Sequence, residues 1–179
     1  SFTDNSKEAE PGAFFVCKGF AFKREYLEIA EEKGAVLYMA QEDFGTGLPR
    51  ILVTDIRKAV SLAARWFYGN PGESMFVTGI TGTKGKTTTA YILKSILDAA
   101  RPGKTAIFST MEINTGAHQH VTHLTTPEPA VLQKYFREAA DSGCDHVVME
   151  VSSQAMKLSR VYGERFPIGM FLNVDEDHV

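Results

Sequence analysis

The stretch Gly79-Ile80-Thr81-Gly82-Thr83-Lys84-Gly85-Lys86-Thr87-Thr88 decides the expected fold of this chain. An apolar strand over residues 75–78 runs into three glycines spaced three apart, and Lys-Thr-Thr then opens a helix over residues 86–99. Glycines let the backbone turn tightly and direct successive N–H groups at an anion, and the helix N-terminus adds its dipole. The pattern therefore predicts a phosphate-binding loop for a nucleoside triphosphate.

Two side chains of this loop have expected roles. Lys86 is placed to reach the β- and γ-phosphates, and the Thr87 hydroxyl to bind Mg²⁺. The general pattern G-x-x-x-x-G-K-[ST] is not met strictly, because Ile80 holds its first glycine position and Gly79 lies one place earlier. A purely structural glycine turn is the alternative. The strand before the loop, the helix after it and the Gly-Lys-Thr sequence all favour the nucleotide site.

Apolar residues around the loop alternate between strand-like and helix-like periods. Strands are expected over 13–17, 35–39, 51–53, 75–78, 105–108, 146–151 and 168–173, helices over 24–33, 55–68, 86–99, 127–142 and 153–158, and a hairpin near 116. This alternation predicts an α/β protein with mainly parallel sheets. The breaker cluster at 69–72 divides it into a small N-terminal α/β domain over 1–70 and a mainly parallel-sheet domain over 71–179 that carries the loop.

Composition excludes several classes of function. The 19 Lys+Arg and 22 Asp+Glu leave a formal net charge of −3, without the basic excess that a nucleic-acid partner requires. No stretch reaches the ~20 apolar residues that membrane insertion needs, and the N-terminal residues lack the apolar run of a secretory signal. Free thiols at Cys17 and Cys144 in a reducing cytoplasm are expected, with one disulfide as the alternative.

The histidines His118, His120 and His123 raise the question of a zinc site. Their H-x-H-x-x-H spacing lacks cysteine or carboxylate partners at the spacing of known zinc sites. We expect a polar hairpin near Gly116 instead of a metal site.

Five segments, in order, resemble motifs of the Mur ligase family. They are residues 79–88, Thr125-Thr126-Pro127-Glu128, residues 149–155, Arg160-Val161 and residues 173–178. In addition, Asp4-Asn5-Ser6-Lys7 and residues 11–16 resemble the UDP-binding entry motif of the branch that extends a UDP-linked muramyl dipeptide. The resemblance covers nearly the whole chain. It implies a uridine-binding N-terminal domain followed by the first part of a P-loop ATPase domain.

The resemblance also implies an activity. The family uses ATP and Mg²⁺ to join a free amino acid, here of the lysine or diaminopimelate type, to UDP-N-acetylmuramoyl-dipeptide through an acyl phosphate. The implied nucleotide-binding residues are Gly79, Thr81, Gly82, Thr83, Lys84, Gly85, Lys86, Thr87 and Thr88. The implied catalytic residues are Lys86, Glu150 and His178, and the implied Mg²⁺ ligands are Thr87, Glu150 and His178. The implied substrate contacts are Ser6, Thr125, Thr126, Ser152 and Arg160.

Alternatives remain at several of these positions. Glu150 could be a buried strand-end carboxylate paired with Lys86, residues 125–127 could form a helix N-cap, and a lone His178 could be inert. The family's carbamylated lysine and C-terminal domain would lie past Val179, so we expect a monomeric fragment without ligase turnover of its own. The alternative functions are another branch of the family, including the folylpolyglutamate synthase type, and a non-catalytic nucleotide-binding module.

Overall fold

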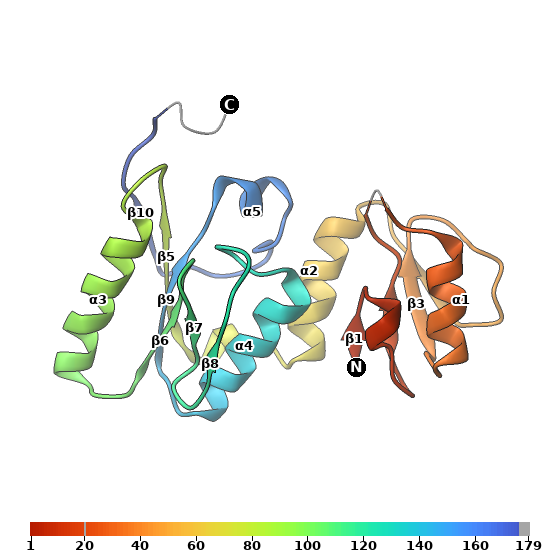
Figure 1. Cartoon of the computed structure of the whole chain (residues 1–179), viewed down its shortest axis with the longest axis horizontal. Helices are drawn as coiled ribbons and strands as arrows, with labels where there is room; N and C mark the ends of the chain where they lie inside the picture. The colour runs from red at the N-terminus through yellow and green to blue at the C-terminus, as the bar shows by residue number, and fades with distance from the viewer. Residues whose placement is uncertain (20, 176–179) are drawn as a thin grey trace. The chain divides into compact units, whose positions relative to one another are not determined.

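The computed structural model describes residues 1–19 and 21–175 and divides the chain into two compact units. The units are Ser1–Ala64 and Arg65–Val179, coloured red to yellow and yellow to blue in Figure 1. The division falls inside helix α2 (Ile56–Phe67), whereas the sequence analysis placed it at residue 70. Arg65 explains the difference, because its guanidinium forms ion pairs with Glu73 at 3.2 Å and Glu164 at 3.0 Å, both in the second unit.

The first unit is a small parallel α/β layer, as predicted. Its sheet has the order β1-β2-β3-β4, with all neighbouring strands parallel. The strands are β1 (Phe2–Thr3), β2 (Phe14–Val16), β3 (Leu37–Ala40) and β4 (Arg50–Leu52), and a 3₁₀ turn, η1, spans Ser6–Glu8. Helix α1 (Arg24–Glu32) buries Leu27 and Ala30 in a core with Phe15 and Tyr38. Strand β1 was not predicted, because two residues are too short to show a period.

The second unit has a six-stranded sheet of order β10-β5-β9-β6-β7-β8. Strands β10 (Ile168–Phe171), β5 (Phe76–Thr81), β9 (His146–Glu150) and β6 (Thr105–Phe108) are parallel. Strands β7 (Ile113–Asn114) and β8 (Gln119–His120) add an antiparallel hairpin at the β6 edge. Gly116 lies between them with a φ of +92°, a conformation that glycine adopts without strain. The predicted parallel sheet and the hairpin near Gly116 are confirmed.

Helices cover both faces of this sheet, as Figure 1 shows for α3 (Lys86–Ala100) and α4 (Pro129–Asp141). Successive side chains of a strand point to opposite faces. The face toward α3 carries Ile80, Ile107 and Val148, and the face toward α4 carries Phe108, Val147 and Met149. Two short elements complete the unit, the 3₁₀ turn η2 (Pro71–Ser74) and helix α5 (Ser153–Lys157), which follows β9.

Helix α4 begins two residues later than the sequence analysis predicted. Pro129 is its first residue, and Glu128 before it is extended with a ψ of 152°. A proline disfavours helical dihedrals at the residue that precedes it, so Glu128 cannot continue a helix begun at Pro127. The alternative of a helix N-cap at Thr125 and Thr126 is therefore wrong.

Two further expectations concern a disulfide bond and a membrane-spanning helix. Cys17 and Cys144 are both free and buried, so the disulfide alternative is wrong. Burial raises the pKa of the Cys17 thiol to about 12. Among residues 1–19 and 21–175, no helix combines the length and apolarity needed to cross a bilayer.

Gly79 lies in strand β5 and not in the phosphate loop, because the strand continues through Thr81. A Cβ added to Gly79 would lie 2.7 Å from Cδ1 of the Phe166 ring, closer than side chains approach one another. Gly79 therefore makes room for an aromatic side chain that packs on the sheet.

Replacing Gly79→Ala should lower the free energy of unfolding by about 1–3 kcal/mol, because the new methyl overpacks the space of Phe166. Gly169→Ala is the matched control, since Gly169 lies opposite Gly79 on β10 and an added Cβ there meets nothing within 4 Å. Urea denaturation measures both changes. Equal effects of the two substitutions would contradict this account.

Candidate functional site

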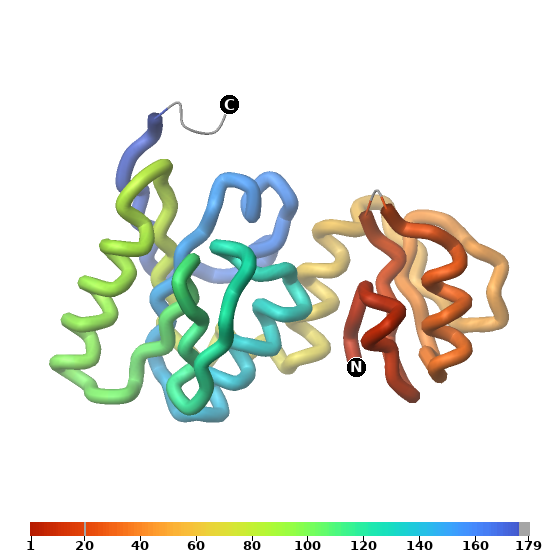
Figure 2. The backbone as a smooth tube through the Cα atoms, viewed as in Figure 1, coloured from red at the N-terminus to blue at the C-terminus, as the bar shows by residue number. Residues whose placement is uncertain are grey.

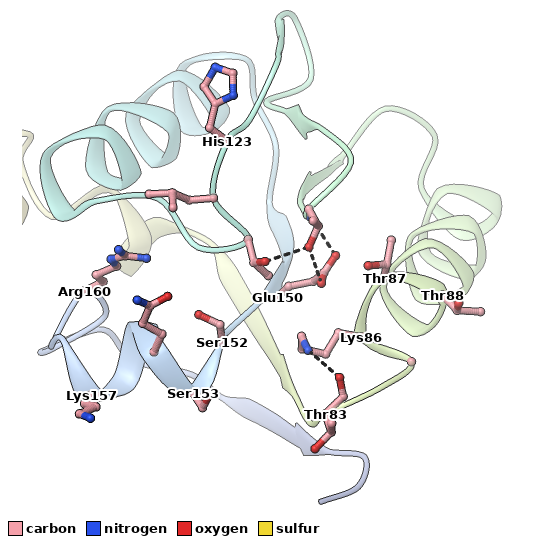
Figure 3. Close-up of a pocket in the computed structure, with 15 residues that line it drawn as sticks. Thr83, Lys86, Thr87, Thr88, His123, Glu150, Ser152, Ser153, Lys157 and Arg160 are labelled. Atoms are coloured by element: carbon pink, nitrogen blue, oxygen red, sulfur yellow. Dashed lines mark hydrogen bonds between the residues drawn. The ribbon is translucent and has the colours of Figure 1, made fainter. Parts of the chain in front are cut away.

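The carboxyl ends of the parallel strands surround a pocket of about 800 Å³ in the second unit. Figure 3 shows side chains around it from the start of α3, the end of β9, helix α5 and the segment that carries His123. The lining residues are Thr83, Gly85, Lys86, Thr87, Thr88, Thr110, His123, Leu124, Thr125, Glu150, Ser152, Ser153, Gln154, Lys157 and Arg160. In an open α/β sheet this edge is the usual place for a ligand.

The phosphate loop ends at the N-terminus of α3, as predicted. Its N-cap residue, Gly85, has a φ of +85°, and no side chain caps the helix there. The N–H groups of a first helical turn have no acceptors within the helix, so this end favours an anion. The Lys86 ammonium donates to the carbonyl oxygens of Gly82 at 2.6 Å and Thr83 at 3.3 Å. The Lys86 ammonium therefore lies against the loop, next to the helix N-terminus.

Asn173, which follows β10, holds the tip of the phosphate loop. Its backbone oxygen accepts from the Thr83 N–H at 3.2 Å, and its side-chain oxygen accepts from the Lys84 N–H at 3.0 Å. The Asn173 amide also donates to the Lys84 carbonyl at 3.0 Å. Figure 2 shows the two segments side by side. The N–H groups of Thr83 and Lys84 therefore donate to Asn173. An anion would be bound by the N–H groups of the residues that follow them.

Glu150 is the last residue of β9, and only 1% of its surface is exposed. Its Oε1 accepts from the Thr110 N–H at 3.0 Å, and its Oε2 lies 3.2 Å from the Thr110 hydroxyl oxygen. The alternative of a Glu150–Lys86 ion pair is wrong for the described residues, because the Lys86 ammonium contacts loop carbonyls instead. A buried carboxylate that lines a pocket beside the Thr87 hydroxyl offers the oxygen ligands that Mg²⁺ prefers.

Thr126 lies behind the pocket wall, although the family resemblance implies a substrate contact for it. Its side chain is completely buried, and its hydroxyl donates to the Glu150 backbone oxygen at 2.9 Å and accepts from the Ser152 N–H at 3.1 Å. The Arg160 guanidinium donates to the Thr126 carbonyl at 3.1 Å, and its Nε lies 2.7 Å from Glu128 Oε1. Thr126 thus ties the segment before α4 to the end of β9.

The other implied substrate residues are distributed between the two units. Thr125, Ser152 and Arg160 line the pocket. Ser152 is also the N-cap of α5, because its Oγ accepts from the Ala155 N–H at 3.1 Å. Ser6 is a buried residue of η1 in the first unit, and His178 lies outside the described residues.

The charges around the pocket favour anionic ligands. Lys86, Lys157 and Arg160 contribute cations, and Glu150 is the lining carboxylate. Nearby on α3, the Tyr91 hydroxyl donates to Glu112 at 2.9 Å. Burial raises the pKa of Tyr91, and the charges of Glu112 and Glu150 raise it further, so this phenol is a neutral donor at physiological pH.

The pocket residues that the sequence did not predict are Thr110, His123, Leu124, Ser153, Gln154 and Lys157. The position of Thr110, two residues past the end of β6, was the available signal, because loops at this edge of a parallel sheet carry ligand groups. His120 lies away from that lining, with its Nε2 2.7 Å from Glu138 Oε2. Within the described part of the chain, no three His, Cys, Asp or Glu side chains form a group suited to a metal ion.

The sequence of this chain is similar to those of known proteins. The pattern described as Mur ligase middle domain matches residues 80–179. The UDP-N-acetylmuramyl-tripeptide synthetases of Limosilactobacillus reuteri and Bifidobacterium longum are 44% and 43% identical and cover 100% and 99% of this chain. A UDP-N-acetylmuramoyl-L-alanyl-D-glutamate–L-lysine ligase of Streptococcus thermophilus is 42% identical over 98% of the chain. The chain spans 36%, 35% and 36% of these three relatives, about a third of their length.

Solved structures agree with these matches. A UDP-N-acetylmuramoyl-L-alanyl-D-glutamate–2,6-diaminopimelate ligase aligns with a TM-score of 0.82 and 21% identity, covering all of this chain and 37% of its own. MurF from Thermotoga maritima, solved with ADP, aligns with a TM-score of 0.67 and 25% identity over 99% of this chain and 38% of its own. With a family pattern over more than half of its residues and the fold of these enzymes, the chain belongs to the Mur ligase family.

Proposed function

We propose that this chain forms the uridine-binding and ATP-binding parts of a ligase that adds an amino acid to UDP-N-acetylmuramoyl-dipeptide in peptidoglycan synthesis. The proposed amino acid is lysine or diaminopimelate, and the proposed cofactors are ATP and Mg²⁺. Relatives named UDP-N-acetylmuramyl-tripeptide synthetase, at 42–44% identity over nearly the whole chain, support this branch of the family. A cytoplasmic monomer is the proposed form.

One observation carries the proposal: an anion-binding loop and a buried carboxylate share one pocket. Lys86 and Thr87 enter it from α3, and Glu150 enters from β9 (Figure 3). A ligase of this kind must bring a substrate carboxylate to a γ-phosphate although both are anions. Cationic side chains and a metal ion offset that repulsion.

The proposed reaction has two steps. A carboxylate oxygen of the muramyl dipeptide attacks the γ-phosphorus of ATP, which forms an acyl phosphate and releases ADP. The amine of the incoming amino acid then attacks the acyl carbon, and phosphate leaves as the amide forms. Lys86 leaves the carbonyls of Gly82 and Thr83 to bind the phosphates, while Thr125, Ser152 and Arg160 hold the muramyl substrate and Ser6 contacts its uridine nucleotide.

Mg²⁺ fits the side chains at this place. Thr87 and Glu150 would hold it, with His178 as the third proposed ligand. When bound, the ion supplies positive charge that stabilises the phosphate oxygens.

The direct test is a ligation assay with the full-length protein, ATP, Mg²⁺ and UDP-N-acetylmuramoyl-dipeptide. We expect amide product and ADP to form with either lysine or diaminopimelate as the added amine. Product only with a UDP-N-acetylmuramoyl-tripeptide as acceptor and a dipeptide as amine would support the MurF type, which the likeness to MurF from Thermotoga maritima makes the second candidate. Nucleotide binding without product from any amine would favour a non-catalytic binding module.

Replacing Lys86→Ala should weaken ATP binding about 10- to 100-fold, because a hydrogen bond to a charged group contributes about 1.5–3 kcal/mol. Isothermal titration calorimetry with ATP and Mg²⁺ measures the change. Lys94→Ala is the matched control, since Lys94 lies on the same helix and pairs with Asp98 one turn later. Unchanged ATP affinity in the Lys86 variant would refute the assignment of the loop.

A further inference from the structure

Thr110 contacts both oxygens of the Glu150 carboxylate. Its backbone N–H donates to Oε1 at 3.0 Å, and its hydroxyl oxygen lies 3.2 Å from Oε2. A carboxylate is bound most firmly when each oxygen has its own donor, because both its rotation and its position are then restricted. In the described part of the chain, the Glu150 carboxylate has no other hydrogen bond.

Two local features place Thr110 beside Glu150. Strand β6 pairs with β9 in parallel, and Phe108 lies opposite Met149, so the residues after both strands leave the sheet together. Ser109 then forms a tight turn: its hydroxyl accepts from the N–H groups of Met111 and Glu112, both at 3.2 Å. Because the turn engages those N–H groups, the Thr110 N–H is left to point at the carboxylate.

The hydroxyl of Thr110 connects Glu150 to Thr125. The two threonine hydroxyl oxygens are 3.1 Å apart. A hydroxyl has one hydrogen and an ionised carboxylate only accepts, so Thr110 donates to Glu150 and accepts from Thr125. The hydrogen bonds therefore run in one direction, from Thr125 through Thr110 to Glu150.

We propose that Thr110 is a positioning residue that holds the Glu150 carboxylate in the orientation that a divalent cation beside the nucleotide requires. The inference rests on the proposed function, in which Glu150 is a metal ligand. Residues that orient a metal ligand change metal affinity when they are removed, without touching the ion themselves. Thr110 is itself exposed at the pocket, so its side chain contributes little to the core.

The experiment measures Mn²⁺ binding, as a substitute for Mg²⁺, by electron paramagnetic resonance of the full-length protein with a non-hydrolysable ATP analogue. Thr110→Val, which keeps the N–H and the branched shape, should weaken Mn²⁺ binding about tenfold. Thr110→Ser restores the hydroxyl and should bind Mn²⁺ within about twofold of the unaltered protein. Thermal unfolding of each variant without ligands shows that the fold is intact.

Thr115→Val is the matched control. Thr115 lies in the same hairpin segment and its hydroxyl donates to the His118 carbonyl at 3.3 Å, but its side chain is buried and is not part of the pocket lining. A general loosening of the hairpin would lower Mn²⁺ affinity in this variant as much as in Thr110→Val. Equal Mn²⁺ affinities in the two variants would therefore overturn the proposal.

Glu150→Gln separates this inference from the proposed function. If Glu150→Gln weakens Mn²⁺ binding and Thr110→Val adds nothing to it in the double variant, the two residues act as one unit, as proposed. Additive losses would mean that Thr110 acts independently of Glu150, which overturns the inference alone. Unchanged Mn²⁺ affinity in Glu150→Gln would mean that Glu150 is not a metal ligand. That result would overturn the proposed metal site and this inference together.

Discussion

Parallel pairing of β5, β9 and β6 is the constraint on which the pocket depends. Ile80 lies opposite Glu150, and Phe108 lies opposite Met149, so these strands end at one edge of the sheet. Helices connect such strands and return the chain to the same starting end, which makes their carboxyl ends meet. The phosphate loop follows β5, Thr110 follows β6, Ser152 follows β9 and Asn173 follows β10. The register of the strands decides which of these polar groups lie close together. The loop that carries each group decides only where its side chain points.

Groups that attract an anion and a group that repels one lie together at this edge of the sheet. The start of α3 and the Lys86 ammonium favour an anion, whereas the buried Glu150 carboxylate repels one. A divalent cation would satisfy both preferences, because phosphate and carboxylate oxygens are both ligands that such an ion prefers. Thr126 has a different part: its hydroxyl donates to the backbone at the end of β9, and its carbonyl accepts from Arg160, so that the pocket wall is kept in place.

Much of the fold could be predicted from the sequence because its signals are local. Glycine spacing and Lys-Thr-Thr marked the loop before α3, and apolar periods located the longer strands of both sheets and the helices between them. The structure differs from the prediction where a distant contact changed a local boundary. Gly79 belongs to β5 because Phe166 packs over it, and α2 ends in the second unit because Arg65 pairs with Glu164. Proline chemistry, which is a local signal, explains the late start of α4.

By itself the sequence determined the types of the longer elements, the parallel α/β class, the glycine-rich loop before α3 and the candidacy of Glu150. It could not show that Thr126 turns its hydroxyl to the backbone of β9, or that Thr110 rather than Lys86 contacts Glu150. Those contacts join residues 24 and 40 positions apart, and Asn173 reaches the phosphate loop across 89 positions. Only the tertiary structure decided them, because they depend on strand order and register, which arise from the packing of the whole sheet and not from any local period.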